Sequence, residues 1–178
     1  MGTYRHPHDP SCPGCTAPDV AFAIHDHAHC TEDVLGRADA LATAKGVRLT
    51  PVRRRVLEIL LEHHRAMGAY EVLERLVGDG FGNQPPVAYR ALEFLVENGL
   101  VHRIQRLNAY LACMHPGEAH APAFMICSTC NAVAEAEADA ARKGLEGAAK
   151  GLGFRVERVT IEALGLCPAC QAGATGWP

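Results

Sequence analysis

The sequence of 178 residues lacks any apolar run near the roughly 18 residues that a helix needs to cross a bilayer. Its first residues, MGTYRHPHDPSCPGC, also lack the apolar segment of a secretory signal peptide. These two absences predict a soluble, cytoplasmic protein with no membrane partner. Because the cytoplasm is reducing, the eight cysteines favour metal binding over disulfides, and redox chemistry is the alternative.

The chain also lacks a positive net charge: its formal charge is −3 at pH 7, which is unusual for a protein that binds nucleic acid. The charge is unevenly distributed, however. Residues 46–111 contain nine Lys and Arg against seven Asp and Glu, or +2, and the rest contains eight against thirteen, or −5. The basic part includes RLTPVRRR, in which we expect Arg48 and Arg54 to contact phosphates. A solvated helix face is the alternative interpretation.

Residues 31–111 combine helical periodicity with a final alternating pattern. Four helices are predicted, from the stretches TEDV at residue 31, TPVRRR at 50, AYEVLERLV at 69 after a turn at Met67-Gly68, and PPVAYRALEFLVENG at 85. Alternation on both sides of LNA then predicts a β-hairpin. Helices followed by a hairpin make a winged helix, whose last helix enters the major groove of DNA. We therefore expect Tyr89 and Arg90 to contact DNA, with ordinary packing and a surface charge as the alternative.

The remainder of the chain predicts a second, smaller α/β domain. The stretches AFMICSTCNAVAEAE and FRVERVTIEALGLC read as strands, and ADAARKGLEGAAKGLG between them reads as a helix. So small a domain has a modest core, and we expect a metal ion and dimerisation to stabilise it. The fold class is thus α+β, with a flexible His- and Cys-rich arm at 1–30, a winged-helix DNA-binding domain at 31–111, a dimerisation domain at 112–171 and a tail at 172–178.

Two C-x-x-C pairs have the spacing of a zinc site: Cys127 with Cys130, and Cys167 with Cys170. Four thiolates at about 2.3 Å satisfy a tetrahedral zinc ion, and each pair aims two sulfurs at one point. The 36 residues between the pairs fit two strands and a helix whose ends the metal joins. A thioredoxin-like redox site is the alternative, but it expects one reactive pair at the start of a helix.

A second group of potential ligands lies between the two predicted domains: His102, Cys113, His120 and Glu135. Two imidazoles, one thiolate and one carboxylate also make a tetrahedral zinc shell. The shell is neutral with the metal and carries two negative charges without it, so a filled site would hold wing and second domain together. A possible third metal site lies in the N-terminal arm, and its residues are Cys12, Cys15, His25, His27, His29 and Cys30. A weakly metal-binding arm is the alternative there.

The blocks RLTPVRRRVLEIL, PPVAYRALEFLVENGLVHRI, NAYLAC and FMICSTCNAV with GLCPAC together resemble the ferric-uptake-regulator family, and specifically its zinc-uptake-regulator branch. The resemblance runs from about Thr31 to Gln171. It implies a homodimeric winged-helix repressor that binds double-stranded operator DNA when loaded with zinc and represses zinc-uptake genes. It also implies two zinc ions per subunit, a structural one on Cys127, Cys130, Cys167 and Cys170 and a sensing one on His102, Cys113, His120 and Glu135.

The sequence departs from that branch at Val87 and Ala88, where Thr-Val is usual. A hydroxyl available to DNA is thereby lost, so the resemblance does not extend to the operator sequence. A regulator that responds to iron or another metal is an alternative, but the soft thiolate of Cys113 favours zinc. A metal-dependent enzyme is an alternative of another class. It would need an open coordination position and a general base, which this ligand set lacks, so we expect neither enzyme activity nor a small-molecule substrate. A purely structural zinc scaffold is the last alternative.

Overall fold

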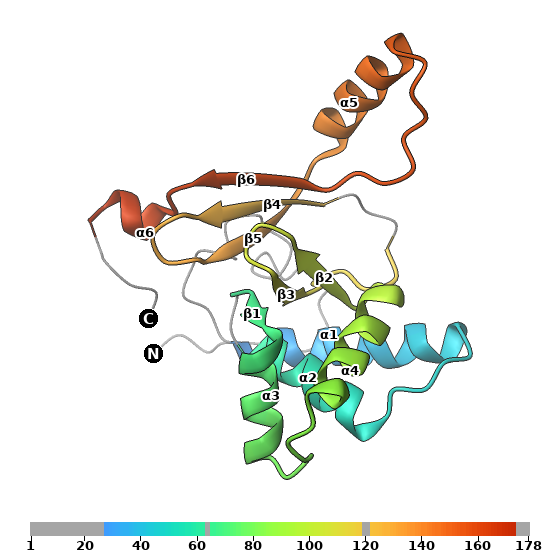
Figure 1. Cartoon of the computed structure of the whole chain (residues 1–178), viewed down its shortest axis with the longest axis vertical. Coiled ribbons are helices and arrows are strands. Elements are labelled where there is room, and N and C mark those ends of the chain that lie inside the picture. The colour runs from blue at the N-terminus through green and yellow to red at the C-terminus, as the bar shows by residue number, and fades with distance from the viewer. Residues whose placement is uncertain (1–26, 63–64, 119–121, 174–178) are drawn as a thin grey trace, which may run out of the picture.

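A computed structural model describes residues 27–62, 65–118 and 122–173, with the backbone alone at 27–30 (Figure 1). Two units follow each other, each with a three-stranded sheet, which confirms the α+β class. The first unit contains α1 (His27–Ala44), α2 (Pro51–Leu61), β1 (Met67–Gly68), α3 (Ala69–Gly78), α4 (Pro85–Glu97), β2 (Val101–Ile104) and β3 (Ala109–Ala112). The second contains β4 (Pro122–Cys127), β5 (Val133–Glu137), α5 (Asp139–Gly151), β6 (Ile161–Gly165) and α6 (Pro168–Gln171).

The first unit is a winged helix, with helices packed on an antiparallel sheet of order β1-β3-β2. The predicted start of α2 is confirmed: Pro51 occupies its first turn, and the Thr50 hydroxyl accepts the Arg53 N–H at 3.5 Å. Leu57 of α2 and Leu92 and Leu95 of α4 are fully buried in the core. Burying each such side chain contributes about 1.5–3 kcal/mol, which fixes α4 with its first turns facing outward.

The second unit has a mixed sheet of order β5-β4-β6, in which β4 and β5 are antiparallel and β4 and β6 are parallel. Helix α5 makes the crossover that a parallel pair requires. It projects away from the sheet (Figure 1), and Ala149 is its single buried residue. The apolar face of α5 is therefore largely uncovered within this chain.

The two units pack against each other through the wing, which is the hairpin of β2 and β3. A buried cluster joins Ile104 and Leu111 of the wing to Phe124, Ile126 and Val133 of the second sheet. The predicted boundary between residues 111 and 112 falls within β3, before its last residue, and stays a prediction.

Three elements differ from their predictions. Helix α1 begins at His27 rather than at Thr31, and residues 67 and 68 form a short strand on β3 rather than a turn, because Met67 pairs with Tyr110 there. The last strand begins at Ile161, whereas residues 154–160 are not a strand. Ile161 pairs with Ala123, next to the first residue of β4, so the preceding residues run past the end of their neighbour. None of the helices in the described part of the chain has the length and apolar character to cross a membrane.

Candidate metal centres and nucleic-acid interface

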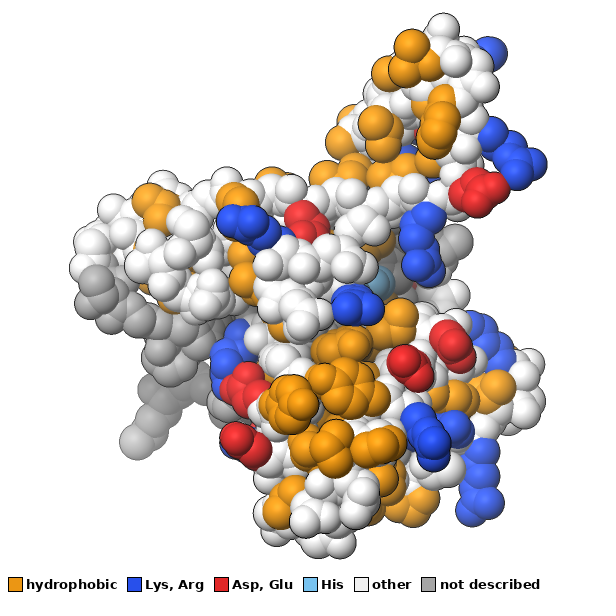
Figure 2. All heavy atoms as spheres, in the orientation of Figure 1, with side chains coloured by type: hydrophobic (Ala, Val, Ile, Leu, Met, Phe, Trp, Pro, Cys, Tyr) orange, Lys and Arg blue, Asp and Glu red, His pale blue; other side chains and the backbone are white. Residues whose placement is uncertain are grey.

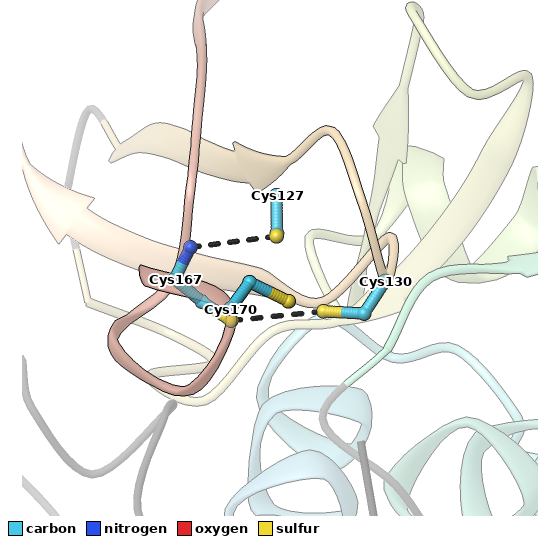
Figure 3. A group of neighbouring side chains, drawn as sticks. All are labelled: Cys127, Cys130, Cys167 and Cys170. Carbon is cyan, nitrogen blue, oxygen red and sulfur yellow. Dashed lines mark hydrogen bonds between the residues drawn. The ribbon is translucent and has the colours of Figure 1, made fainter. Parts of the chain in front are cut away.

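Four cysteines meet at one end of the second sheet (Figure 3). Cys127 ends β4, Cys130 lies in the turn before β5, Cys167 precedes α6 and Cys170 lies within it. Their sulfur atoms all lie within 4.8 Å of one another. They converge because β4 and β6 run parallel, so the chain leaves both strands at the same edge.

The spacing of these sulfurs fits zinc. The sulfurs of Cys130 and Cys167 are 3.7 Å apart, and a tetrahedral ion with sulfur ligands at 2.3 Å separates those ligands by about 3.8 Å. Cys127 and Cys167 are only 1% and 3% exposed, so the cluster is shielded from water. Cys130 and Cys170 are half-buried. Four soft protein donors that leave no open coordination position are typical of a structural zinc site rather than a catalytic one.

The backbone around Cys127 favours its thiolate. Burial raises the pKa of this thiol, but hydrogen bonds from the N–H groups of Cys130, Cys167 and Thr129 and from the Cys130 thiol together outweigh burial and lower the pKa to about 6. The Cys167 N–H lies 3.4 Å from the Cys127 sulfur. Burial and the neighbouring thiols raise the pKa of Cys170 to about 12. The Cys170 thiol is therefore anionic at neutral pH only when a cation replaces its proton.

A second group of donors lies where the wing meets the second sheet. His102 of β2, Cys113 just after β3 and Glu135 of β5 offer ligand atoms within 4.8 Å of one another, and we call this group the junction site. His102 Nε2 is 3.6 Å from Glu135 Oε1, and the His102 ring packs against Phe124 at 5.2 Å between centroids. The Cys113 N–H donates to the Leu100 carbonyl at 3.0 Å, which fixes the start of the linker.

The junction site also suits a cation. Burial and then the negative charge of Glu135 raise the pKa of Cys113 to about 12, so its thiol stays protonated at neutral pH unless a positive ion replaces the proton. Nitrogen, sulfur and oxygen donors on one ion suit zinc. The structure thus brings together three of the four predicted ligands, and His120 lies outside the described residues.

The start of α4 presents the predicted DNA-contacting residues to solvent. Tyr89 is 38% exposed and Arg90 is exposed, whereas Ala88 is fully buried and is unable to contact DNA. Tyr70 of α3 is 66% exposed and stands edge-on to Tyr89, at 6.3 Å between ring centroids. Apolar side chains gather on this face of the first unit (Figure 2). Tyr70 was not among the predicted residues, although its position off the buried stripe of Val72, Leu73 and Leu76 indicates an exposed aromatic residue.

The two predicted phosphate-binding arginines differ in their surroundings. Arg48 is exposed before α2, and its carbonyl accepts a hydrogen bond from Arg53 at 2.8 Å. Arg54 is paired instead with Asp39 of α1 at 2.7 Å and with Glu58 at 3.4 Å. The hydrogen bond to Asp39 is the main cause that raises the pKa of Arg54. A phosphate must therefore compete with Asp39 for this guanidinium.

The residues proposed for a third metal site are not placed. Cys12, Cys15 and His25 lie outside the described residues. His27, His29 and Cys30 belong to α1, but their side chains also lie outside what the structure describes. This possible site stays a prediction.

Comparison with known proteins assigns the chain to a family. Residues 44–164 match the model of the ferric uptake regulator family. The zinc uptake regulation protein of Escherichia coli (strain K12) is 36% identical over 141 residues, which are 79% of this chain and 82% of that protein. A zinc uptake regulator complexed with zinc and DNA matches with a TM-score of 0.77 and 35% identity, over 80% of this chain and 96% of the other. A holo XcZur crystal structure matches with a TM-score of 0.71 and 34% identity, over 83% and 99%. The chain therefore belongs to the ferric uptake regulator family.

Proposed function

We propose that the protein is a zinc-responsive transcriptional repressor whose zinc-loaded homodimer binds operator DNA in the cytoplasm and represses zinc-uptake genes. The observation that carries this proposal is the junction site, where His102 of the wing and Cys113, which directly follows the wing, meet Glu135 of the second sheet. A metal ion held there joins the DNA-binding unit to the second unit. The names of two relatives, a zinc uptake regulation protein and a zinc uptake regulator complexed with zinc and DNA, support it.

Two zinc ions per subunit would have different roles. The thiols of Cys127, Cys130, Cys167 and Cys170, of which the first and third are buried and the other two half-buried, would hold a structural ion that closes the end of the second sheet. His102, Cys113, Glu135 and, by resemblance, His120 would hold the regulatory ion. The N-terminal cysteines and histidines remain candidates for a third.

The response to zinc follows from charge. A bound zinc ion supplies two positive charges, which offset the Cys113 thiolate and the Glu135 carboxylate. Because these ligands come from different units, their approach selects one orientation of the wing, and of α4, relative to the second sheet. In a dimer that orientation sets the distance between the two α4 helices, which must be about 34 Å, or a multiple, to reach successive major grooves.

The second unit supplies the surface for the homodimer. Leu145 and Leu152 of the α5 region are 49% and 84% exposed, and Phe154 is 66% exposed. Figure 2 shows apolar side chains over the projecting helix. Exposed groups of this size favour burial against a second copy, and β6 offers an open sheet edge beside them. We place the dimer interface on the exposed side chains of Leu145, Leu152 and Phe154 and on the open edge of β6.

Two alternatives are weaker. A regulator of iron or another metal would share this architecture, but the Cys113 thiolate is a softer ligand than ferrous iron or manganese prefers. The family consists of regulators, and the protein is not an enzyme.

The test is a DNA-binding titration. A labelled duplex, enriched from a random-sequence pool by the zinc-loaded protein, is titrated with protein that holds only the structural zinc, with and without added Zn²⁺. We expect affinity to rise at least tenfold with zinc and to fall again with a chelator, as differential binding to two states requires. Equal affinity in both conditions would contradict the proposal, and a response to Fe²⁺ but not to Zn²⁺ would favour the iron alternative.

A further inference from the structure

One transverse row of the second sheet faces the wing. Phe124 of β4 pairs with Glu135 of β5 and with Glu162 of β6. Residues that pair directly across neighbouring strands have their side chains on the same face of the sheet. Glu135, Phe124 and Glu162 therefore form a continuous line, which we call the sheet row.

Each member of the sheet row contacts the wing. Glu135 reaches His102, and Phe124 packs against the His102 ring. Glu162 reaches the turn that follows β2: its Oε1 accepts the Gln105 N–H at 2.6 Å and its Oε2 accepts the Arg106 N–H at 2.9 Å. The wing is thus held at two points, by metal ligands at one and by a carboxylate at the other.

The turn of the wing is shaped to hold that carboxylate. Asn108 has a φ of +47°, and its N–H donates to the Gln105 carbonyl at 3.1 Å, which closes the turn. The N–H groups of Gln105 and Arg106 consequently point outward side by side. Two adjacent backbone N–H groups form a concave anion site, and a charged acceptor makes both hydrogen bonds stronger than neutral ones. The contact uses no metal ligand.

We propose that Glu162 is a positioning residue for zinc sensing: its clasp on the wing turn holds His102 and Cys113 opposite Glu135 before the metal binds. This inference rests on the proposed function of the junction site. His102 precedes Gln105 by three residues, about 10 Å along an extended strand, so a wing fixed at its turn has little freedom at His102. Less free energy is then needed to immobilise the wing when zinc binds. The clasp therefore strengthens zinc binding, as preorganisation does in general.

Glu162→Gln tests the clasp with little change in shape. An amide presents one oxygen acceptor, and its NH₂ group faces a backbone N–H with which it is unable to bond. Glu157→Gln is the matched control, because Glu157 is an exposed carboxylate a few residues earlier that pairs with Arg155 at 2.8 Å. Glu162→Asp, which keeps the charge, is the conservative variant. It should retain part of the wild-type amide protection and zinc affinity.

The first measurement needs no zinc at the junction site. Hydrogen exchange of the Gln105 and Arg106 amides is followed by NMR in full-length protein that holds the structural zinc alone. We expect both amides to exchange roughly tenfold faster in Glu162→Gln than in wild type or Glu157→Gln, corresponding to about 1.4 kcal/mol. Unchanged exchange would overturn the clasp.

The second measurement is the zinc affinity of the junction site, by competition with a chelating indicator. We expect roughly tenfold weaker binding in Glu162→Gln, with unchanged zinc at the four cysteines and a melting temperature lowered by no more than a few degrees. DNA affinity at saturating zinc should stay within about twofold of wild type, since the closed state remains available. Zinc affinity equal to that of Glu157→Gln would overturn the positioning role. A wild-type protein that binds zinc but gains no DNA affinity would overturn the proposed function instead, and amide exchange and zinc affinity would still decide the clasp.

Discussion

Replacing Cys113 with serine removes the thiol of the junction site with little change in packing, because oxygen replaces sulfur at a fully buried position. The fold, the dimer and the zinc at the four cysteines should persist. Serine is a far weaker zinc ligand than a thiolate. If four ligands share the roughly 10–16 kcal/mol of a thiolate-rich zinc site, the loss of one costs about 3 kcal/mol, or roughly a hundredfold in zinc affinity.

The thiol also predicts a pH dependence. With the pKa of Cys113 at about 12, roughly one thiol in 10⁵ is ionised at pH 7, so zinc binding must release its proton. Protons compete with zinc, and raising the pH relieves that competition. The contribution of Cys113 to zinc affinity should therefore rise about tenfold per pH unit at every pH well below 12.

Two assays check these values. Calorimetry in buffers of different ionisation enthalpy should detect about one proton released by Cys113 per zinc in the wild type. DNA binding of Cys113→Ser should no longer strengthen at the zinc concentration that saturates the wild type. Cys12→Ser, the same change in the N-terminal segment, should keep the response. If Cys113→Ser responds to zinc as the wild type does, the reasoning is refuted and the N-terminal cysteines and histidines become the candidate sensor.

Three further predictions concern the other surfaces. Cys127→Ser should give protein that is largely unfolded in its second unit or monomeric, because metal binding there is coupled to folding; circular dichroism and size-exclusion chromatography would show it, and a stable, DNA-binding dimer would count against the structural site. Arg90→Ala should weaken binding to the selected duplex more than to random DNA, and Tyr89→Ala should change base preference, whereas Arg54→Ala should weaken both duplexes alike and flatten the salt dependence by about one unit; equal effects of all three would contradict this division. Phe154→Glu should shift the protein towards monomer in sedimentation experiments, because it places a charge in the proposed dimer interface, and an unaltered dimer would exclude Phe154 from that interface.

The sequence predicted best where local chemistry decides the structure. The Thr50 cap and Pro51 mark the start of α2 by themselves, and the hairpin around Asn108 follows from alternation and a turn residue of positive φ. The convergence of Cys127 and Cys167 was predictable because each C-x-x-C pair aims two sulfurs at one point, and one tetrahedral zinc ion takes four thiolates.

The sequence predicted less where distant neighbours decide. Residues 67 and 68 are a strand because β3 offers a partner, and residues 154–160 are not one because β4 begins only beside Ile161. The apolar periodicity of a segment indicates neither of these outcomes, because each depends on a strand elsewhere in the chain. The clasp of Glu162 likewise depends on a register between strands that are far apart in sequence, and no local pattern distinguishes Glu162 from any other glutamate.

The parallel pairing of β4 with β6 also has a consequence for biosynthesis. The ribosome releases the chain from its N-terminus, and the winged-helix unit, whose helix contacts are local, is complete by Ala112. The second sheet is complete only after β6 has been synthesised, because β6 pairs with β4. The zinc ligands Cys167 and Cys170 are synthesised later still. We expect nascent chains to fold a DNA-binding unit first and to acquire the structural metal only when almost all of the described chain has emerged. Prematurely terminated chains would then lack both the zinc and the β6 edge, and should be unable to compete with intact repressor as paired subunits on DNA.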